Sequence, residues 1–270
     1  MSNEFVTNPI DIGGIARRVL NVFFVIDTSG SMAGTAIAQV NMGIQNTIDT
    51  LKQEAHTADA QLKLAVLEFN SGATWLNPAG PQDIEDFMFV NPLEAGGLTD
   101  MGAALTELDS KLSRSAYLDS ITGNYLPLII FLSDGQPTDD YKKALDKIRN
   151  NKWFTRARKI AFAVGDAPDI TMLANVTGSV ESVIKMEDLS QLAKLITFAS
   201  VTASMVQSKS RVDTSDDTSE LIGSIIDELP GAEVATDTDV DQSEYAPEPV
   251  DPPVDPNAAV DPNADPWAGW

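Results

Sequence analysis

The stretch that decides the fold is VFFVIDTSGS, residues 22–31. It opens with five apolar residues in a row, from Val22 to Ile26. An unbroken apolar run of this length is typical of a central strand that is buried on both faces of a sheet. The polar residues that follow, 27–31, therefore lie where this strand ends.

Strand and helix patterns alternate from this stretch to about residue 206. Apolar runs predict further strands at 62–69, 128–132, 159–164 and 182–185, and a short antiparallel edge strand at 73–76. Apolar residues spaced three and four apart predict helices at 37–51, 101–112, 139–149 and 189–205. Repeated βα units of this kind predict an α/β fold: a doubly wound, mostly parallel, open sheet of the Rossmann type with helices on both faces.

Composition divides the chain into an N-terminal extension (1–19), the α/β domain (20–206) and a tail (207–270). Sixteen of the 40 acidic residues and eight of the 15 prolines lie in the tail, where Lys209 and Arg211 are the only bases. Such a segment buries too little apolar surface to offset its ordering entropy. We therefore expect a disordered, acidic, Pro-rich tail.

Three features of the tail are more specific. Apolar residues on one face predict a short amphipathic helix at 219–229. The sequence VDPNA occurs at 254–258 and again at 260–264, and such Pro-rich repeats favour extended chain. Trp267 and Trp270 are either anchors for a groove on a partner or simply exposed.

The net charge of −22 and the pI of about 4.1 exclude several classes of partner. A chain this acidic repels nucleic acid and anionic lipid, so metal ions or basic proteins are the better candidates. The absence of cysteine excludes disulfides and fits a reducing compartment. The start of the chain lacks a signal peptide's character, and no apolar run is long enough to span a bilayer. We expect a cytoplasmic protein without membrane or nucleic-acid partners.

Three polar segments flank the predicted strand ends: residues 27–31, 96–100 and 133–135. In open parallel sheets, ligands bind beyond the carboxyl ends of the strands, where the strand order reverses. We therefore expect the oxygen-bearing side chains of these segments to converge: the carboxylates of Asp27 and Asp134 and the hydroxyls of Ser29, Ser31 and Thr99.

Two carboxylates and three hydroxyls suit a hard divalent cation. Magnesium prefers oxygen ligands, takes one or two carboxylates and keeps several waters, so we expect Mg²⁺, with Mn²⁺ and Ca²⁺ as alternatives. The charges of two carboxylates only balance the charge of a divalent ion. The ion can therefore still accept an acidic ligand from outside. The pattern predicts a metal-bridged docking site for an Asp or Glu of a partner protein.

The order D-x-S-x-S, then a threonine in a glycine-rich loop, then an aspartate after a later strand resembles the metal-ion-dependent adhesion site (MIDAS) of von Willebrand factor A (vWA) domains, over residues 20–206. The resemblance implies that Ser29 and Ser31 ligate the metal directly and that Thr99 joins when ligand binds. It implies that Asp27 and Asp134 act as charged supports, often through water. It also implies a protein-interaction module rather than an enzyme.

The phrases at 27–32 and 133–140 resemble more specifically the TerY group of bacterial tellurium-resistance proteins. This resemblance implies a bacterial stress-response or defence protein that works with a protein kinase and a PP2C-type phosphatase. The acidic tail is not part of it.

Each of these residues also has an ordinary structural interpretation. Asp27 and Ser29 are suited to cap the helix that follows the first strand, and Thr99 to cap the helix at 101–112. For residues 138–140 we expect only a structural role, as the cap and first turn of the next helix. Convergence of all three segments at strand ends favours the metal site.

The main rival function is magnesium-dependent phosphoryl transfer. Asp27 lies where haloacid dehalogenase-type enzymes carry a nucleophilic aspartate, but the second aspartate of that motif is replaced by Ser29. No general base is at hand, because His56 belongs to a polar helix end and cysteine is absent. A third hypothesis is that an aspartate of the VDPNA repeats occupies the metal site in cis and inhibits it, since the linker is long enough.

Overall fold

The computed structural model describes residues 17–55, 60–165, 167–186, 189–209, 222–227 and 231–247. They form one eight-stranded sheet in the order β3-β2-β1-β5-β6-β7-β8, with β4 beside β2. The strands are β1 (Val19–Asp27), β2 (Gln61–Asn70), β3 (Gly72–Trp75), β4 (Gln82–Asp83), β5 (Leu128–Ser133), β6 (Arg158–Val164), β7 (Val183–Met186) and β8 (Ala232–Val234). Strands β2, β1, β5, β6 and β7 are parallel, whereas β3, β4 and β8 are antiparallel to their neighbours. The predicted doubly wound, mostly parallel sheet is confirmed.

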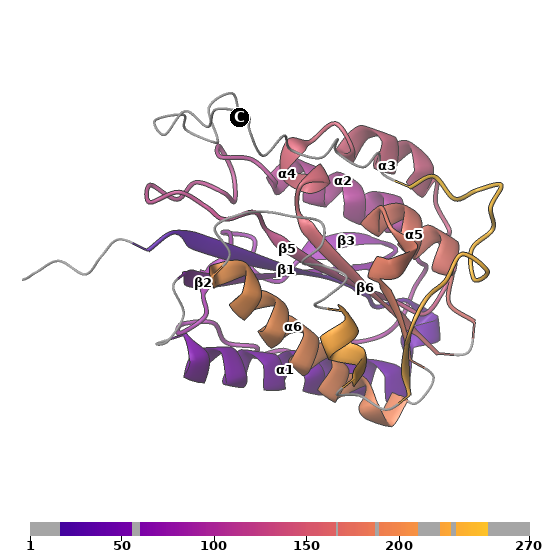
Figure 1. The fold of residues 1–270 in the computed structure, drawn as a ribbon, viewed down its shortest axis with the longest axis horizontal. Helices are drawn as coiled ribbons and strands as arrows, with labels where there is room; N and C mark the ends of the chain where they lie inside the picture. The colour runs from indigo at the N-terminus through magenta and orange to yellow at the C-terminus, as the bar shows by residue number, and fades with distance from the viewer. Residues whose placement is uncertain are drawn as a thin grey trace, which may run out of the picture.

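Helices cover both faces of the sheet (Figure 1). Helices α1 (Thr35–Glu54) and α6 (Leu192–Lys209) lie on one face, and α2 (Met101–Lys111), α3 (Tyr141–Ile148), α4 (Lys152–Thr155) and α5 (Ile170–Thr177) on the other. Short 3-10 turns are η1 (Gly30–Met32), η2 (Val180–Ser182) and η3 (Leu189–Gln191). Helix α5 was not expected from the sequence. All but one of its residues are buried, so its sequence lacks the alternation of apolar and polar faces by which a helix is predicted.

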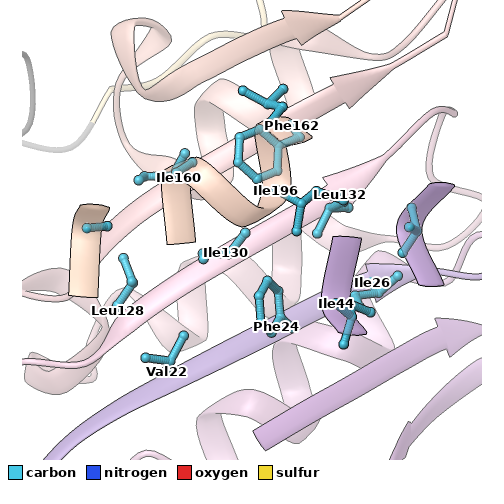
Figure 2. Packing of buried hydrophobic residues seen from close by; sticks show 14 of the residues in the cluster. Val22, Phe24, Ile26, Ile44, Leu128, Ile130, Leu132, Ile160, Phe162 and Ile196 are labelled. Carbon is cyan, nitrogen blue, oxygen red and sulfur yellow. The ribbon is translucent and has the colours of Figure 1, made fainter. Parts of the chain in front are cut away.

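The central strand β1 is buried along its whole length. Its side chains alternate between two cores because successive residues of a strand point to opposite faces. Figure 2 shows one core, in which Phe24 of β1 lies with residues of β5 and β6 beneath Ile44 of α1 and Ile196 of α6. Phe23 belongs to the core on the other face, under α2 and α3. Burial on both faces explains why the run from Val22 to Ile26 is unbroken.

The strand order reverses between β1 and β5. From β1 the chain proceeds to β2 and β3 on one side, and then returns to β5, β6 and β7 on the other. In the register of this pair, Ile26 lies beside Leu132. The next residues, Asp27 and Ser133, are the last of their strands, so β1 and β5 end at the same level, at the topological switch point where ligands bind in such folds.

The tail differs from expectation over residues 231–247, here called the C-terminal strap. Its first residues form β8, which pairs with β7. The remainder lies on α3 and α5: Glu244 accepts a 2.9 Å hydrogen bond from Lys142, and the carbonyl of Ala246 accepts one of 2.7 Å from Arg149. Disorder is therefore wrong for the strap. Ala232, Ala235 and Val240 of the strap are buried, whereas its carboxylates face solvent or lysines. Overall composition does not reveal this distribution.

Residues 222–227, within the expected amphipathic helix, are helical. Ile222 and Ile225 are buried in the same core as α1 and α6. The N-terminal residues 1–16, His56, the VDPNA repeats and the two terminal tryptophans lie outside the described residues. Among the described helices, none is long and apolar enough to cross a membrane.

Deleting residues 210–270 should destabilise the domain, whereas deleting only 248–270 should not. The longer deletion removes two buried isoleucines, each worth about 1.5–3 kcal/mol, and the strand that covers β7. We expect Tm to fall by roughly 10 °C, since about 1 kcal/mol corresponds to 2–4 °C in a domain of this size. Differential scanning calorimetry of the three chain lengths checks this; equal Tm for both deletions would show that residues 210–247 contribute no stability.

Candidate metal centre

Asp27 is the most deeply buried residue of the candidate site. Its side chain has no solvent exposure, and both carboxylate oxygens accept hydrogen bonds. The backbone N–H of Ser29 donates to Oδ1 at 2.8 Å, and the hydroxyl of Ser133 donates to Oδ2 at 2.6 Å. Asp27 thus ties the end of β1 both to its own loop and to the end of β5. An exposed carboxylate oxygen, which a nucleophile needs, is not present on Asp27.

Ser29, Ser31 and Asp134 form a continuous row of oxygens above Asp27. The hydroxyls of Ser29 and Ser31 are 3.0 Å apart, and the hydroxyl of Ser31 donates to Asp134 Oδ1 at 2.8 Å. Ser29 is buried, Asp134 is half-buried and Ser31 is exposed. The row therefore starts in the interior of the domain at Ser29 and reaches the surface at Ser31. Ser29 is the N-cap residue of η1 but its side chain makes no capping bond, so the capping interpretation of Ser29 does not hold.

The hydroxyl of Thr99, on the loop before α2, lies close to the same row of oxygens. A Cβ atom built on Gly135 would lie 3.5 Å from Ser31 Oγ and 3.9 Å from Thr99 Oγ1. The two hydroxyls therefore face a common point beside the Asp134 loop. The backbone N–H of Gly30 also donates to the carbonyl of Gly97 at 3.2 Å, which joins the first loop to the threonine loop. The structure brings all five predicted residues together; their role as metal ligands stays a prediction.

Thr138 and Asp139 have a role that was not found in the sequence. Thr138 Oγ1 accepts from Thr99 N at 3.0 Å, and Thr138 N donates to Thr99 O at 2.8 Å. The carboxylate of Asp139 accepts from the backbone N–H groups of Gly102 and Ala103, at 2.9 and 3.0 Å. These residues were expected only to cap and start their own helix, α3. Instead Asp139 caps α2, and together they fasten the Thr99 loop to the Asp134 loop.

One signal for this contact is present in the sequence. Gly102 lies in the first turn of α2, where glycine is otherwise unfavourable. A Cβ atom at this position would lie 2.7 Å from Asp139 Oδ2, so the close approach of the carboxylate requires glycine. A lone helical glycine indicates a close neighbour but not which one.

Burial raises the pKa of both carboxyl groups of the site. For Asp27, burial raises the pKa, hydrogen bonds from Ser133 and Ser29 lower it, and the nearby charge of Asp134 raises it again. For Asp134, burial raises the pKa and the hydrogen bond from Ser31 lowers it. Two desolvated carboxylates close to each other are stabilised in their charged forms by a cation.

The donor set fits a hard divalent cation. In the described part of the chain no three His, Cys, Asp or Glu side chains gather to hold a metal. The convergence is instead one of two carboxylates with hydroxyls, all of them oxygens, which matches magnesium or manganese better than metals that prefer nitrogen and sulfur. Ser29, Ser31 and Thr99 would hold such an ion directly, with Asp27 and Asp134 supplying charge. A bound ion would supply an electrophilic position for an external carboxylate.

The family model for the von Willebrand factor type A domain matches residues 21–198. The chain belongs to the von Willebrand factor type A domain family. The matched range contains the whole of the site described above. The expected vWA fold is thus confirmed, whereas the TerY grouping is not tested by this match.

Known proteins resemble this vWA domain over part of their length. Inter-alpha-trypsin inhibitor heavy chain H2 of Homo sapiens is 32% identical over 136 residues, which are 48% of this chain and 14% of that protein. Heavy chain H6 of Homo sapiens is 28% identical over 172 residues, 61% of this chain and 13% of that protein. The chain therefore spans only a small part of the length of these curated relatives.

Two solved structures show the same fold. The von Willebrand factor type A structure from Catenulispora acidiphila has a TM-score of 0.53 at 19% identity and covers 70% of this chain and 43% of that one. The ArnB paralog VWA2 from Sulfolobus acidocaldarius has a TM-score of 0.50 at 18% identity and covers 68% of this chain and 46% of that one. At this level of identity the likeness extends to the fold alone.

The metal response of this vWA domain should depend on pH. Because the pKa values of Asp27 and Asp134 are raised, their protonated forms stabilise the metal-free fold, and this stabilisation is lost as pH rises through the raised pKa values. Cation binding needs the charged forms, so it weakens as pH falls. We expect Mn²⁺ to raise Tm strongly at pH 7 and much less at pH 4.5. Asp134→Asn should abolish the response without lowering the metal-free Tm at pH 7; a response equal at both pH values would contradict the assignment.

Thr138 should position Thr99 through its hydroxyl. Thr138→Val leaves the N–H of Thr99 without its acceptor, at a cost of about 1–3 kcal/mol, and Thr138→Ser keeps the hydroxyl. We expect Thr138→Val to weaken Mn²⁺ binding several-fold in calorimetric titration and Thr138→Ser to restore it. If Thr138→Val lowers only Tm and not the affinity for Mn²⁺, the contact is purely structural.

Proposed function

We propose that this vWA domain is a non-enzymatic adaptor that binds an Asp or Glu of a partner protein through a divalent cation. The proposed ligands are Ser29, Ser31 and Thr99, with Asp27 and Asp134 as charged supports. The observation that carries the proposal is the meeting of these side chains at the switch point of the sheet, on loops joined by direct hydrogen bonds. Membership of a family of typically metal-dependent interaction modules supports it.

The exposure gradient of the site supports an external ligand. Asp27 and Ser29 are buried, so they serve the ion from within the domain. Ser31 is exposed and lies on the surface side of the row. A carboxylate arriving from solvent therefore meets the site on the side of Ser31. We propose Mg²⁺ as the resident ion, with Mn²⁺ and Ca²⁺ as alternatives, because all donors are hard oxygens.

Phosphoryl transfer is disfavoured by the same geometry. A nucleophilic aspartate needs an accessible oxygen, and Asp27 is fully buried with both oxygens engaged. The site residues otherwise offer hydroxyls and Asp134, whose Oδ1 accepts from Ser31. A phosphate-release assay with generic phosphoesters separates the two functions, and turnover lost in Asp134→Ala would refute the adaptor proposal.

The cellular setting is a further part of the proposal. The TerY-like phrases at 27–32 and 133–140 support a bacterial stress-response role beside a protein kinase and a PP2C-type phosphatase. The absence of cysteine supports a cytoplasmic location. The kinase and the phosphatase are the first partners to try, in binding measurements with and without chelator.

Calorimetric titration of Mg²⁺ and Mn²⁺ into the chelator-stripped protein tests the metal site. We expect one saturable site in the wild type and none in Asp134→Ala. The matched control is Asp146→Ala on α3, which removes an exposed aspartate outside the site. Equal binding by Asp134→Ala and the control would count against the assigned ligands.

A further inference from the structure

The surface around the metal site is acidic and has no basic residue in its loops. These loops are residues 27–38, 70–72, 94–100 and 133–140, and none of them contains Lys or Arg. They contain acidic residues besides the two proposed supports. Glu94 and Asp140 are exposed, and Asp100 is half-buried. We call Glu94, Asp100 and Asp140 the acidic rim.

The rim lies on the same loops that build the site. The N–H of Gly96 donates to the carbonyl of Thr28 at 2.8 Å, which attaches the Glu94 segment to the loop after β1. Asp100 follows Thr99 directly and accepts from Thr138 Oγ1 at 3.0 Å. Asp140 follows Asp139, the cap of α2. An approaching partner therefore meets the rim and the metal site together.

The rim carboxylates have no ionic partner among the described residues. In the ranges that the structure describes, no ion pair involves Glu94, Asp100 or Asp140. The first base after the 133–140 loop, Lys142, is paired at 2.9 Å with Glu244 of the C-terminal strap. The strap thus adds a carboxylate beside α3 and pairs with the base that lies nearest to this loop in the sequence.

We infer that the partner's metal-binding carboxylate is flanked by Lys or Arg side chains, which pair with the acidic rim. This inference rests on the proposed function, because the carboxylate needs the metal. One divalent ion balances only Asp27 and Asp134, so a partner segment that is acidic throughout is repelled by the remaining charges. A segment with bases on either side of its carboxylate meets complementary charge at the ion and at the rim.

Three synthetic peptides with a single central Asp test the inference: one flanked by Lys, one by Ser and one by Glu. Each carries a fluorophore and is titrated with the full chain in Mn²⁺ by fluorescence anisotropy. Two exposed charge pairs correspond to roughly a tenfold gain in affinity. We expect the Lys-flanked peptide to bind about tenfold tighter than the Ser-flanked one, with the gap shrinking in high salt. The Glu-flanked peptide should bind weakest.

Variants of the rim provide the matched comparison. Glu94→Gln combined with Asp140→Asn should remove most of the preference for the Lys-flanked peptide while leaving Mn²⁺ affinity in calorimetry intact. Asp86→Asn combined with Asp146→Asn changes the net charge equally at exposed positions outside these loops and should keep the preference. Equal affinity for the Lys- and Ser-flanked peptides, or a preference unchanged in the rim variant, overturns the inference.

Two controls separate this inference from the proposed function. A Lys-flanked peptide with Asn in place of its Asp, and the Asp peptide with chelator, should both lose binding. If binding persists in either case, attraction to the acidic surface alone explains it and the inference fails. If Mn²⁺ binds in calorimetry but no Asp peptide does, the adaptor proposal fails together with the inference. If the Ser-flanked peptide binds as well as the Lys-flanked one and needs Mn²⁺, the adaptor proposal stands and only the inference fails.

Discussion

The buried carboxylate of Asp27 is the constraint on which the site depends. It lies where two apolar parallel strands, β1 and β5, end side by side, and it is held by the hydroxyl of Ser133 and the N–H of Ser29. Burying a charge is costly unless hydrogen bonds or an opposite charge compensate it. Hydrogen bonds meet part of this cost, and the proximity of Asp134 adds to it. A cation bound beside the row of hydroxyls, as proposed, would complete the compensation, so folding and metal binding would favour the same arrangement.

The contacts around this centre join its loops to one another. Thr138 and Asp139 fasten the threonine loop and the start of α2 to the loop that leads into α3. The C-terminal strap in turn contacts α3 and α5 through Lys142, Arg149 and backbone groups. Any displacement of Thr99 on ligand binding would therefore also involve α2 and the loop that leads into α3.

The sequence predicts the sheet well because its signals are local. The central strands β1 and β5 contain continuous apolar runs, and Asp27 and Asp134 lie at or just after the ends of these strands. Both the fold and the convergence of Asp27 with Asp134 therefore follow from strand ends. Contacts between distant segments are not encoded locally. Asp139 reads as a cap of its own helix and instead caps α2, 37 residues away from Gly102. Helix α5 lacks a polar stripe, and the strap is mostly polar, so periodicity and composition miss both.

The acidic residues of the chain have two different structural placements, in the strap and in the loops around the site. Acidic residues of the strap pair with Lys142 and Lys185, which joins the strap to the domain and engages bases at the surface. The loops around the site contribute carboxylates and no bases. A divalent ion held by Ser29, Ser31 and Thr99 would then be the one positive centre within these loops. With the ion in place, acidic side chains of other proteins would be repelled by these loops except at that point. The surrounding charge would then restrict where a carboxylate docks as well as which segment presents it.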